Sequence, residues 1–510
     1  MGLLQKLAGQ TALYGISSIV ARMLNYLLVP LHTHIHYGFG ASEYGIFSEL
    51  YAYVAFLNIL YTYGMETAFF RFAAAQPSAA GKQRVFNQLM SCMLVSTVLF
   101  SALLWWLTPN LSSALGYTDR PYLLYWLIGI LSIDTLLALP YAQLRLQGKA
   151  SRFAAARVFN IGLNVLLNVF FLVICRQMAG GAYGSALQPL GERLFQPELG
   201  IGYVFLANLL ANGAVILWFW PIFSAFRWDW DGSVLKPVLH YAWPLMLMGL
   251  AGMVNEVSDR ALLKYWLPAH YYPNLSPIEA VGVYSAVYKL AIFMSLVTQA
   301  FRYAAEPFFF GQSADKKAPQ TFARVMRYFV LACCMIYVGV SLNLSWLQYF
   351  LGQEVYRQGI WIVPLLLLAN LCLGVYQNLS IWFKLTDSTI AGAWLTGLGA
   401  LITVGVNFAL IPQLGYPAAA IATLVAYATM MVVCYLWGQK HYPIPYEVGY
   451  ALSLIAAATV LIVVGHWAVQ GWSFWPSLGL HWGLIGVFLA LIAWYERPLL
   501  MAIGQKLTRR

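Results

Sequence analysis

Long apolar runs, separated by short polar segments, dominate the hydrophobic pattern of this chain. A transmembrane α-helix needs about 20 consecutive apolar residues, and about fourteen runs of this length follow one another. They lie approximately at 8–31, 44–66, 86–107, 121–143, 153–175, 201–225, 238–266, 281–305, 321–343, 358–381, 389–411, 416–437, 448–468 and 479–496. The pattern therefore predicts an all-α polytopic membrane protein with about 14 transmembrane helices.

The composition excludes a soluble protein. The 510 residues are 61% hydrophobic and 9% charged, whereas a soluble domain carries roughly 25% charged residues. The 19 Trp and 33 Tyr are typical of a protein with two membrane interfaces. All six cysteines fall inside apolar runs without metal-ligand spacing, so we interpret them as packing residues. We expect no metal site, no cofactor and no nucleic-acid partner.

The net charge of +11 comes from basic residues that gather in alternate loops. Because cytoplasmic loops carry an excess of Lys and Arg, the more basic set of loops is assigned to the cytoplasm together with both termini. This basic set holds Arg71, Lys82, Arg84, Arg145, Lys149, Arg152, Arg227, Lys236, Lys316, Lys317, Arg324, Lys384, Lys440, Lys506, Arg509 and Arg510. The opposite set holds only Arg120, Arg176, Arg193 and Arg357.

The chain also repeats itself after about 238 residues. Gly45-Ile-Phe-Ser-Glu-Leu-Tyr51 corresponds to Gly282-Val-Tyr-Ser-Ala-Val-Tyr288, and Arg22 corresponds to Arg260. Each repeat holds six helices, an even number, so both enter the membrane from the same side as parallel repeats do. We predict a first six-helix bundle at 1–235, a second at 236–440 and two extra C-terminal helices at 441–510.

Several short stretches carry a family resemblance. They are Gly9-Gln-Thr-Ala-Leu-Tyr-Gly15, Glu43-Tyr-Gly-Ile-Phe-Ser48, Tyr63-Gly-Met-Glu-Thr-Ala-Phe-Phe-Arg71 and Asn407-Phe-Ala-Leu-Ile-Pro-Gln-Leu-Gly415. With the arrangement of six, six and two helices, they resemble the Wzx-type polysaccharide or O-antigen flippases. These belong to the multidrug/oligosaccharidyl-lipid/polysaccharide (MOP) exporter superfamily.

The resemblance implies a transporter that moves undecaprenyl-pyrophosphate-linked oligosaccharide from the inner to the outer leaflet of the bacterial inner membrane. Such export by alternating access supplies surface polysaccharide and lipopolysaccharide synthesis. The expected partners are the lipid-linked oligosaccharide, membrane lipid, and the polysaccharide polymerase and glycosyltransferases of the same pathway. We expect a monomer that is not an enzyme.

Charged residues inside the predicted helices are the candidates for function. Each costs about 2.5–3.5 kcal/mol at the bilayer centre, so each must face another charge, water or substrate. The seven considered are Arg22, Asp134, Arg157, Glu256, Asp259, Arg260 and Lys289.

Three of these cations lie at a similar predicted depth. Arg22, Arg260 and Lys289 each lie eight residues from the outer end of a helix, which is about 12 Å at a rise of 1.5 Å per residue. Cations at this depth suit a pyrophosphate, and the arginine fork matches phosphate oxygens. The alternative is neutralisation within the protein, with Glu256 pairing Arg260 at i, i+4 and Glu49 pairing Arg22.

The acidic residues admit two interpretations each. Glu256 and Asp259 either bind H⁺ or Na⁺ and couple transport to a gradient, or only balance Arg260. Glu66 and Glu306 end the second and eighth helices as either a gate or a helix-end clamp.

Two further groups are expected to be structural. Asp134 and Arg157 are predicted to form an ion pair. The alternating His32, His34 and His36 are interpreted as a solvated loop and not as a metal site.

Two other functions stay open, and a third is rejected. A flippase of the lipid-linked peptidoglycan precursor would use the same chemistry on a different sugar. A cation-coupled multidrug extruder of the same superfamily would need acids and aromatic residues for organic cations, whereas the predicted cavity is mainly cationic. A glycosyltransferase, polymerase or ligase is disfavoured because the outer loops are short and carry few carboxylates.

Overall fold

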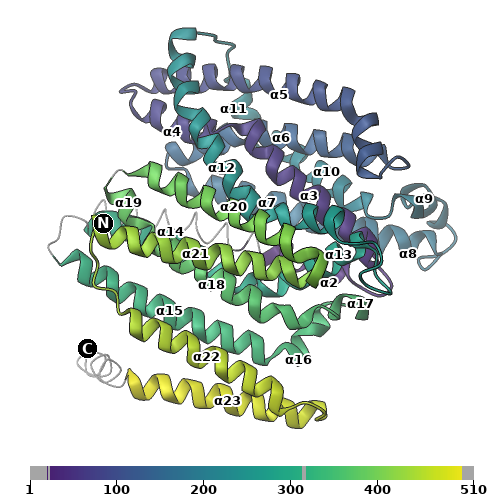
Figure 1. Ribbon diagram of the computed structural model, residues 1–510. Helices are drawn as coiled ribbons and strands as arrows, with labels where there is room; N and C mark the ends of the chain where they lie inside the picture. The colour runs from purple at the N-terminus through teal and green to yellow at the C-terminus, as the bar shows by residue number, and fades with distance from the viewer. Residues whose placement is uncertain (1–19, 21–22, 313–316, 387, 497–510) are drawn as a thin grey trace, which may run out of the picture. The chain divides into compact units, whose positions relative to one another are not determined.

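The computed structural model describes residues 20, 23–312, 317–386 and 388–496, and it is helical almost throughout that range without a single β-strand (Figure 1). Eleven helices in this part of the chain are long and apolar enough to cross a membrane. A twelfth is added if the bent pair Gln188–Leu199 and Gly202–Trp218 forms one span. The predicted fold class is therefore confirmed, and the first predicted helix, 8–31, lies mostly outside the described residues.

One further helix, α3 (Ala41–Thr62), has 22 residues and is long enough to cross a bilayer. It is not among the eleven because Glu43, Glu49, Asn58 and several tyrosines lower its hydropathy. The second predicted run, 44–66, thus forms α3, which ends at Tyr63 and Gly64 in left-handed backbone conformations. The short α4 (Met65–Ala74) begins directly after this turn.

The chain divides by packing into two compact units. The first comprises 1–286, 352–356 and 393–426, and the second comprises 287–351, 357–392 and 427–510. This division does not test the predicted boundaries at 235 and 440, which stay a prediction.

The first unit is built from long helices. Besides α3 and α4 they are α5 (Ala79–Leu115), α6 (Pro121–Leu146), α7 (Ala150–Val169), α10 (Gly202–Trp218), α12 (Gly232–Trp266), α13 (Pro277–Tyr288) and most of α20 (Thr389–Leu414). Helix α5 packs along α6, α10 packs against α6 and α7, and α12 packs along α3. A short α8 (Arg176–Ala179) and α9 (Gln188–Leu194) occupy the long loop before α10.

Where α3 and α13 cross, the residues in contact are equivalent positions of the internal repeat. A Cβ atom on Gly45 would overlap the carbonyl oxygen of Ile278, and one on Gly282 would overlap the carbonyl oxygen of Ala41. Gly45 and Gly282 are equivalent in the internal repeat, and so are Ala41 and Ile278. The contact is therefore self-complementary, as a twofold relation requires. Only glycine allows the two backbones to approach this closely.

The second unit holds α14 (Ile292–Gln312), α15 (Ala318–Leu342), α18 (Val363–Leu379), α22 (Val448–Ala468) and α23 (Phe474–Tyr495). The C-terminal helices α22 and α23 lie beside α15 (Figure 1). Arg327 of α15 binds both of their ends, with Nη1 2.8 Å from Glu447 and Nη2 2.6 Å from Glu496. The remaining long helix, α21 (Pro417–His441), has residues in both units.

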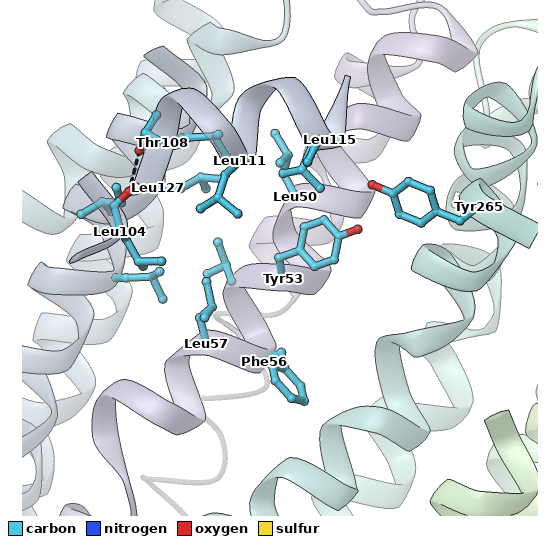
Figure 2. A pocket seen from close by; sticks show the side chains of 15 residues that line it. Leu50, Tyr53, Phe56, Leu57, Leu104, Thr108, Leu111, Leu115, Leu127 and Tyr265 are labelled. Carbon is cyan, nitrogen blue, oxygen red and sulfur yellow. Dashed lines mark hydrogen bonds between the residues drawn. The ribbon is translucent and has the colours of Figure 1, made fainter. Parts of the chain in front are cut away.

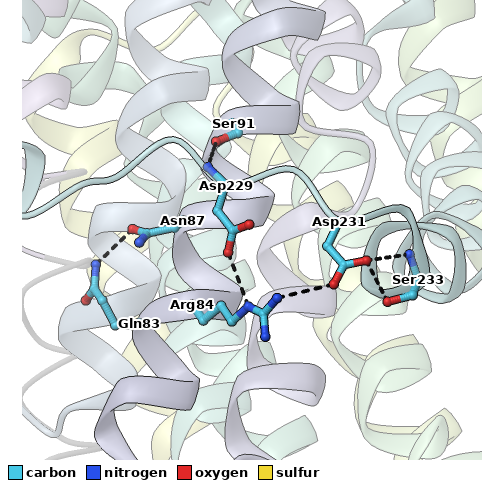
Figure 3. A network of polar contacts seen from close by, with 7 residues as sticks. All are labelled: Gln83, Arg84, Asn87, Ser91, Asp229, Asp231 and Ser233. Carbon is cyan, nitrogen blue, oxygen red and sulfur yellow. Dashed lines mark hydrogen bonds and ion pairs between the residues drawn. The ribbon is translucent and has the colours of Figure 1, made fainter.

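A polar network caps the N-terminus of α12 (Figure 3). Asp231 is the N-cap and accepts a hydrogen bond of 2.9 Å from the backbone N–H of Ser233. The Ser233 hydrogen bonds, with Arg84 nearby, lower the pKa of the Asp231 carboxyl. Arg84 lies 3.3 Å from both Asp229 and Asp231, and its side chain is 65% exposed. Exposed pairs of this kind contribute little stability, so the network mainly fixes where α12 begins.

Candidate functional site

The first feature of the site is a buried ion pair between α3 and α12. The Lys264 ammonium lies 2.8 and 3.0 Å from the two carboxylate oxygens of Glu49. It also donates 2.7 Å to the carbonyl of Leu115, the last residue of α5. A cation at a helix C-terminus is stabilised by the helix dipole. Lys264 therefore connects three helices of the first unit at one point.

Tyrosine hydroxyls surround the same carboxylate. Tyr53 donates to Glu49 at 2.8 Å and Tyr265 at 3.3 Å, and Tyr117 also donates to it. The Glu49 side chain is fully buried and that of Lys264 is 14% exposed. A carboxylate offers about four acceptor positions, so these contacts satisfy it completely, as a buried charge requires.

The second feature is the cluster around Arg260, one helical turn before Lys264 on α12. Arg260 Nη1 lies 2.8 Å from Asp259 Oδ1 and donates 2.9 Å to the backbone carbonyl of Glu256. The Tyr284 hydroxyl of α13 donates 2.5 Å to the other Asp259 oxygen. Asp259 is buried, and the Arg260 side chain is 14% exposed. The arginine is thus paired within the protein while part of its surface stays accessible.

The predicted pairing of Glu256 with Arg260 is not what the structure contains. Asp259 supplies the carboxylate, and Glu256 contributes only its backbone oxygen. The Glu256 side chain is exposed and, within the described part of the chain, makes no ion pair. The Arg260 guanidinium folds back along α12. It therefore contacts the adjacent Asp259 carboxylate and the Glu256 backbone oxygen, and not the Glu256 carboxylate.

The other predicted phosphate ligands are not brought together by the described residues. Arg22 lies outside them. Lys289 is half-buried in the 3-10 turn Lys289–Ala291 that follows α13, and it belongs to the second unit. The grouping of three cations around one pyrophosphate therefore stays a prediction.

Of the two predicted gate residues, Glu66 forms an ion pair with Arg145 at the end of α6. Arg71, which lies near it in sequence, instead places its guanidinium 4.3 Å above the Tyr241 ring. Glu306 lies in α14, but its side chain is outside the described part. The choice between gate and clamp stays open.

The predicted ion pair of Asp134 with Arg157 is wrong. Asp134 accepts a hydrogen bond of 2.7 Å from Asn212. Arg157 packs its guanidinium 4.3 Å from the centre of the Tyr141 ring, a favourable cation–π contact. No salt bridge joins these two described residues, whose printed contacts are with the Asn212 amide and with aromatic rings.

The interpretation of the histidines also needs correction. His32 is buried and its Nε2 lies 3.0 Å from Asn168 Oδ1, so it belongs to the packed interior of the first unit. His36 is exposed. No metal-binding group of three His, Cys, Asp or Glu occurs among the described residues.

Sequence reasoning missed the Glu49–Lys264 pair. In the sequence, Arg22 is the cation proposed as the ion-pair partner of Glu49. Lys264 lies two residues before α12 ends, where the ammonium group of a lysine normally extends into water. The available signal was that both charges interrupt apolar runs.

An apolar cavity of about 450 Å³ is lined in part by Tyr53 and Tyr265, both of which donate to Glu49. Figure 2 shows the side chains around it. Its walls come from α3, α5 and α6, with Tyr265 contributed by α12. The hydroxyls of Tyr53 and Tyr265 point toward each other at one side of it (Figure 2). The cavity is the third feature of the site.

Comparison with known proteins places the fold. No family model matches the chain, and no curated protein matches it in sequence. Among solved structures, an inward-facing MATE family multidrug transporter of the MOP superfamily covers 89% of this chain and 96% of its own, with 14% identity and a TM-score of 0.52. A MATE transporter in the bent conformation covers 90% and 99%, with 15% identity and a TM-score of 0.52. The chain therefore has the fold of a MOP-superfamily multi-pass transporter.

Within that fold, the lipid II flippase MurJ in an inward closed conformation is more similar. It covers 96% of this chain and 99% of its own, with 13% identity and a TM-score of 0.70. The predicted resemblance to the superfamily is confirmed at the level of the fold. The Wzx branch stays a prediction.

Proposed function

We propose that the chain is a flippase that moves undecaprenyl-pyrophosphate-linked oligosaccharide from the inner to the outer leaflet of the bacterial cytoplasmic membrane. It does so by alternating access, as a monomer without a cofactor and without breaking a covalent bond. Its product feeds surface polysaccharide or lipopolysaccharide synthesis, where the polymerase and glycosyltransferases are its partners. The observation that carries this proposal is the TM-score of 0.70 with a flippase, against 0.52 with the MATE transporters.

The same observation favours a second candidate, a lipid II flippase, because that is the activity in the name of the more similar structure. The two candidates differ in the glycan and share the lipid-linked diphosphate. A multidrug extruder has less support, because the MATE multidrug transporters match this fold less closely than the flippase does.

Arg260 is the proposed contact for the diphosphate. Its fork can bind two phosphate oxygens, and its pairing with Asp259 keeps the empty site neutral in a membrane. A fully unpaired cation would hold the head group too strongly to release it. Arg22 and Lys289 are proposed to complete the site.

The experiment separates substrate binding from charge balance. Arg260→Ala should abolish surface polysaccharide in a strain that depends on this protein, when transport is normalised to the membrane abundance of the variant. Arg260→Lys should restore only part, because a point charge lacks the bidentate fork. The decisive variant is Arg260→Ala combined with Asp259→Asn, which removes both charges. If Arg260 binds substrate, this double variant stays inactive.

Recovery of transport in the double variant would contradict the proposal, because the arginine would then only neutralise Asp259. Arg152→Ala is the matched control, since Arg152 is an exposed cytoplasmic-side arginine by prediction. Arg145 is unsuitable as a control because it pairs with Glu66. Expression in strains that lack either a polysaccharide flippase or a lipid II flippase distinguishes the two candidate substrates.

A further inference from the structure

The apolar cavity lined in part by Tyr53 and Tyr265 has the length of one membrane leaflet. Along α5 its wall is formed by Leu104, Thr108, Leu111 and Leu115, which share one helix face. From the first to the last of these the helix rises about 16 Å at 1.5 Å per residue. The hydrocarbon core of a bilayer is about 30 Å thick, so the cavity extends over about half of it. We call this cavity the α5 slot.

The lining of the α5 slot offers no free hydrogen-bond donor to a ligand. The Thr108 hydroxyl donates 2.8 Å to the carbonyl of Leu104 in its own helix. The hydroxyls of Tyr53 and Tyr265 are both directed to Glu49. All other lining side chains are apolar.

This chemistry excludes several occupants. Ordered water needs two to four polar partners, but the hydroxyl groups in the lining already donate to the protein and the other lining side chains are apolar. An organic cation needs an accessible acid, but Glu49 is fully buried and already saturated by Lys264 and tyrosines. A volume of about 450 Å³ is within the range of ligand sites. The slot is therefore suited to a hydrocarbon chain.

The position of the α5 slot indicates which leaflet the bound hydrocarbon chain occupies. Leu115 is the last residue of α5, and the loop charges place this end of the helix at the periplasmic face. The slot then extends from the outer rim to about the middle of the membrane. Tyr265, on its wall, directly follows Lys264 on α12, the helix that also carries Arg260.

We propose that the α5 slot binds the part of the isoprenyl chain next to the head group of the lipid-linked oligosaccharide in the outer leaflet. This inference rests on the proposed function, which identifies the bound hydrocarbon chain as an isoprenyl chain. The head group is held from α12 while its hydrocarbon tail must stay in an apolar medium. A slot that starts on the same helix and runs down one leaflet meets both conditions.

The test uses the full-length protein in detergent and measures bound lipid by native mass spectrometry. The probes are undecaprenyl monophosphate and dioleoyl phosphatidylglycerol. Wild type should retain the undecaprenyl lipid in preference to the phospholipid. Leu111→Trp fills the slot and should weaken undecaprenyl binding by about tenfold or more, a change of about 1.4 kcal/mol. Leu99→Trp is the matched control, because Leu99 is on the same helix but 64% exposed, and its binding should equal wild type.

A second measurement covers the case in which Leu111→Trp fails to fold. A photoactivatable polyprenyl phosphate is cross-linked to wild-type protein, and the labelled peptides are mapped. Labels on the slot-lining residues of α3, α5 or α6 support the proposal. Labels confined to residues outside this lining, equal retention of both lipids, or wild-type binding by a folded Leu111→Trp would each overturn it. Both assays measure binding alone, so failure of glycan transport with intact slot binding would contradict the proposed function and not the slot.

Discussion

The contacts of the individual charged residues reflect the free-energy cost of placing a charge inside a membrane. Glu49 and Lys264 are enclosed between helices, and each satisfies the other together with three tyrosines and one backbone carbonyl. Such a pair adds little stability compared with apolar residues, but removal of one partner leaves the other uncompensated. The same reasoning applies to Arg260, whose partner Asp259 is buried.

Lys264→Ala should destabilise the protein by about 3–5 kcal/mol, because Glu49 would remain buried without its cation. Lys264→Met combined with Glu49→Gln should regain most of that loss, since it removes both charges. Thermal unfolding of the purified variants in detergent measures the difference. Equal melting temperatures for Lys264→Ala and the double variant would show that the charge pairing does not determine stability.

Cation coupling is a separate prediction at this scale and concerns Glu256. Its exposed carboxylate can reach an ion, whereas Asp259 is held by Arg260 and Tyr284. Glu256→Gln should remove the dependence of transport on a proton or sodium gradient and leave substrate binding unchanged. Transport into vesicles with and without each gradient measures this effect. Unchanged gradient dependence in both Glu256→Gln and Asp259→Asn would assign both acids a structural role.

At the scale of elements, the crossing of α3 and α13 holds the two repeats together through backbone contact. Its residues are related by the internal repeat, so one small surface is used twice. The helix formed by α13 and α14 is interrupted just beyond it, at the 3-10 turn Lys289–Ala291. Such interruptions often mark hinges, and the boundary between the two compact units lies next to this one, at Ala286.

Gly45→Ala or Gly282→Ala should destabilise the protein by about 1–3 kcal/mol or more, because the added methyl group overlaps a carbonyl oxygen that cannot rotate away. Gly162→Ala in α7 is the control, since a Cβ there meets nothing within 4 Å. That control should be neutral or slightly stabilising, as alanine favours a helix. Melting temperatures and membrane abundance test the contrast. Similar behaviour of all three variants would mean that the crossing relaxes easily.

At the scale of the whole molecule, orientation follows from the loop charges and not from the packing of the helices. The basic segment that holds Arg84 adjoins the start of α12, where Asp229 and Asp231 also lie. The long 176–199 segment carries α8 and α9 between two apolar spans and belongs to the opposite, less basic set. This asymmetry predicts that both termini are cytoplasmic.

A reporter that is active only in the periplasm should therefore stay silent when fused after Arg510. The same reporter inserted after Gly184 should be active. Gly184 has a φ of +92° in a turn, where insertions are tolerated well. Reporter activity per unit of membrane-inserted protein is the measurement. The reverse pattern would overturn either the number of spans or their orientation.

The amino-acid sequence alone specifies the all-helical membrane fold, because runs of apolar residues long enough to span a bilayer admit almost no other structure. It also shows that Gly45 and Gly282 are equivalent positions, since the two copies of the internal repeat align residue by residue there. It required every intramembrane charge to have a partner.

The partner of each charge, in contrast, depends on how the helices pack in three dimensions. Lys264 meets Glu49 across 215 residues of chain, Arg157 meets Tyr141 in place of Asp134, and Arg260 meets Asp259 in place of Glu256. The choice depends on how helices pack, and apolar periodicity fixes that weakly because membrane helices are apolar on most sides. For the same reason the α5 slot has no signature in the sequence, since its lining leucines look like those that face lipid.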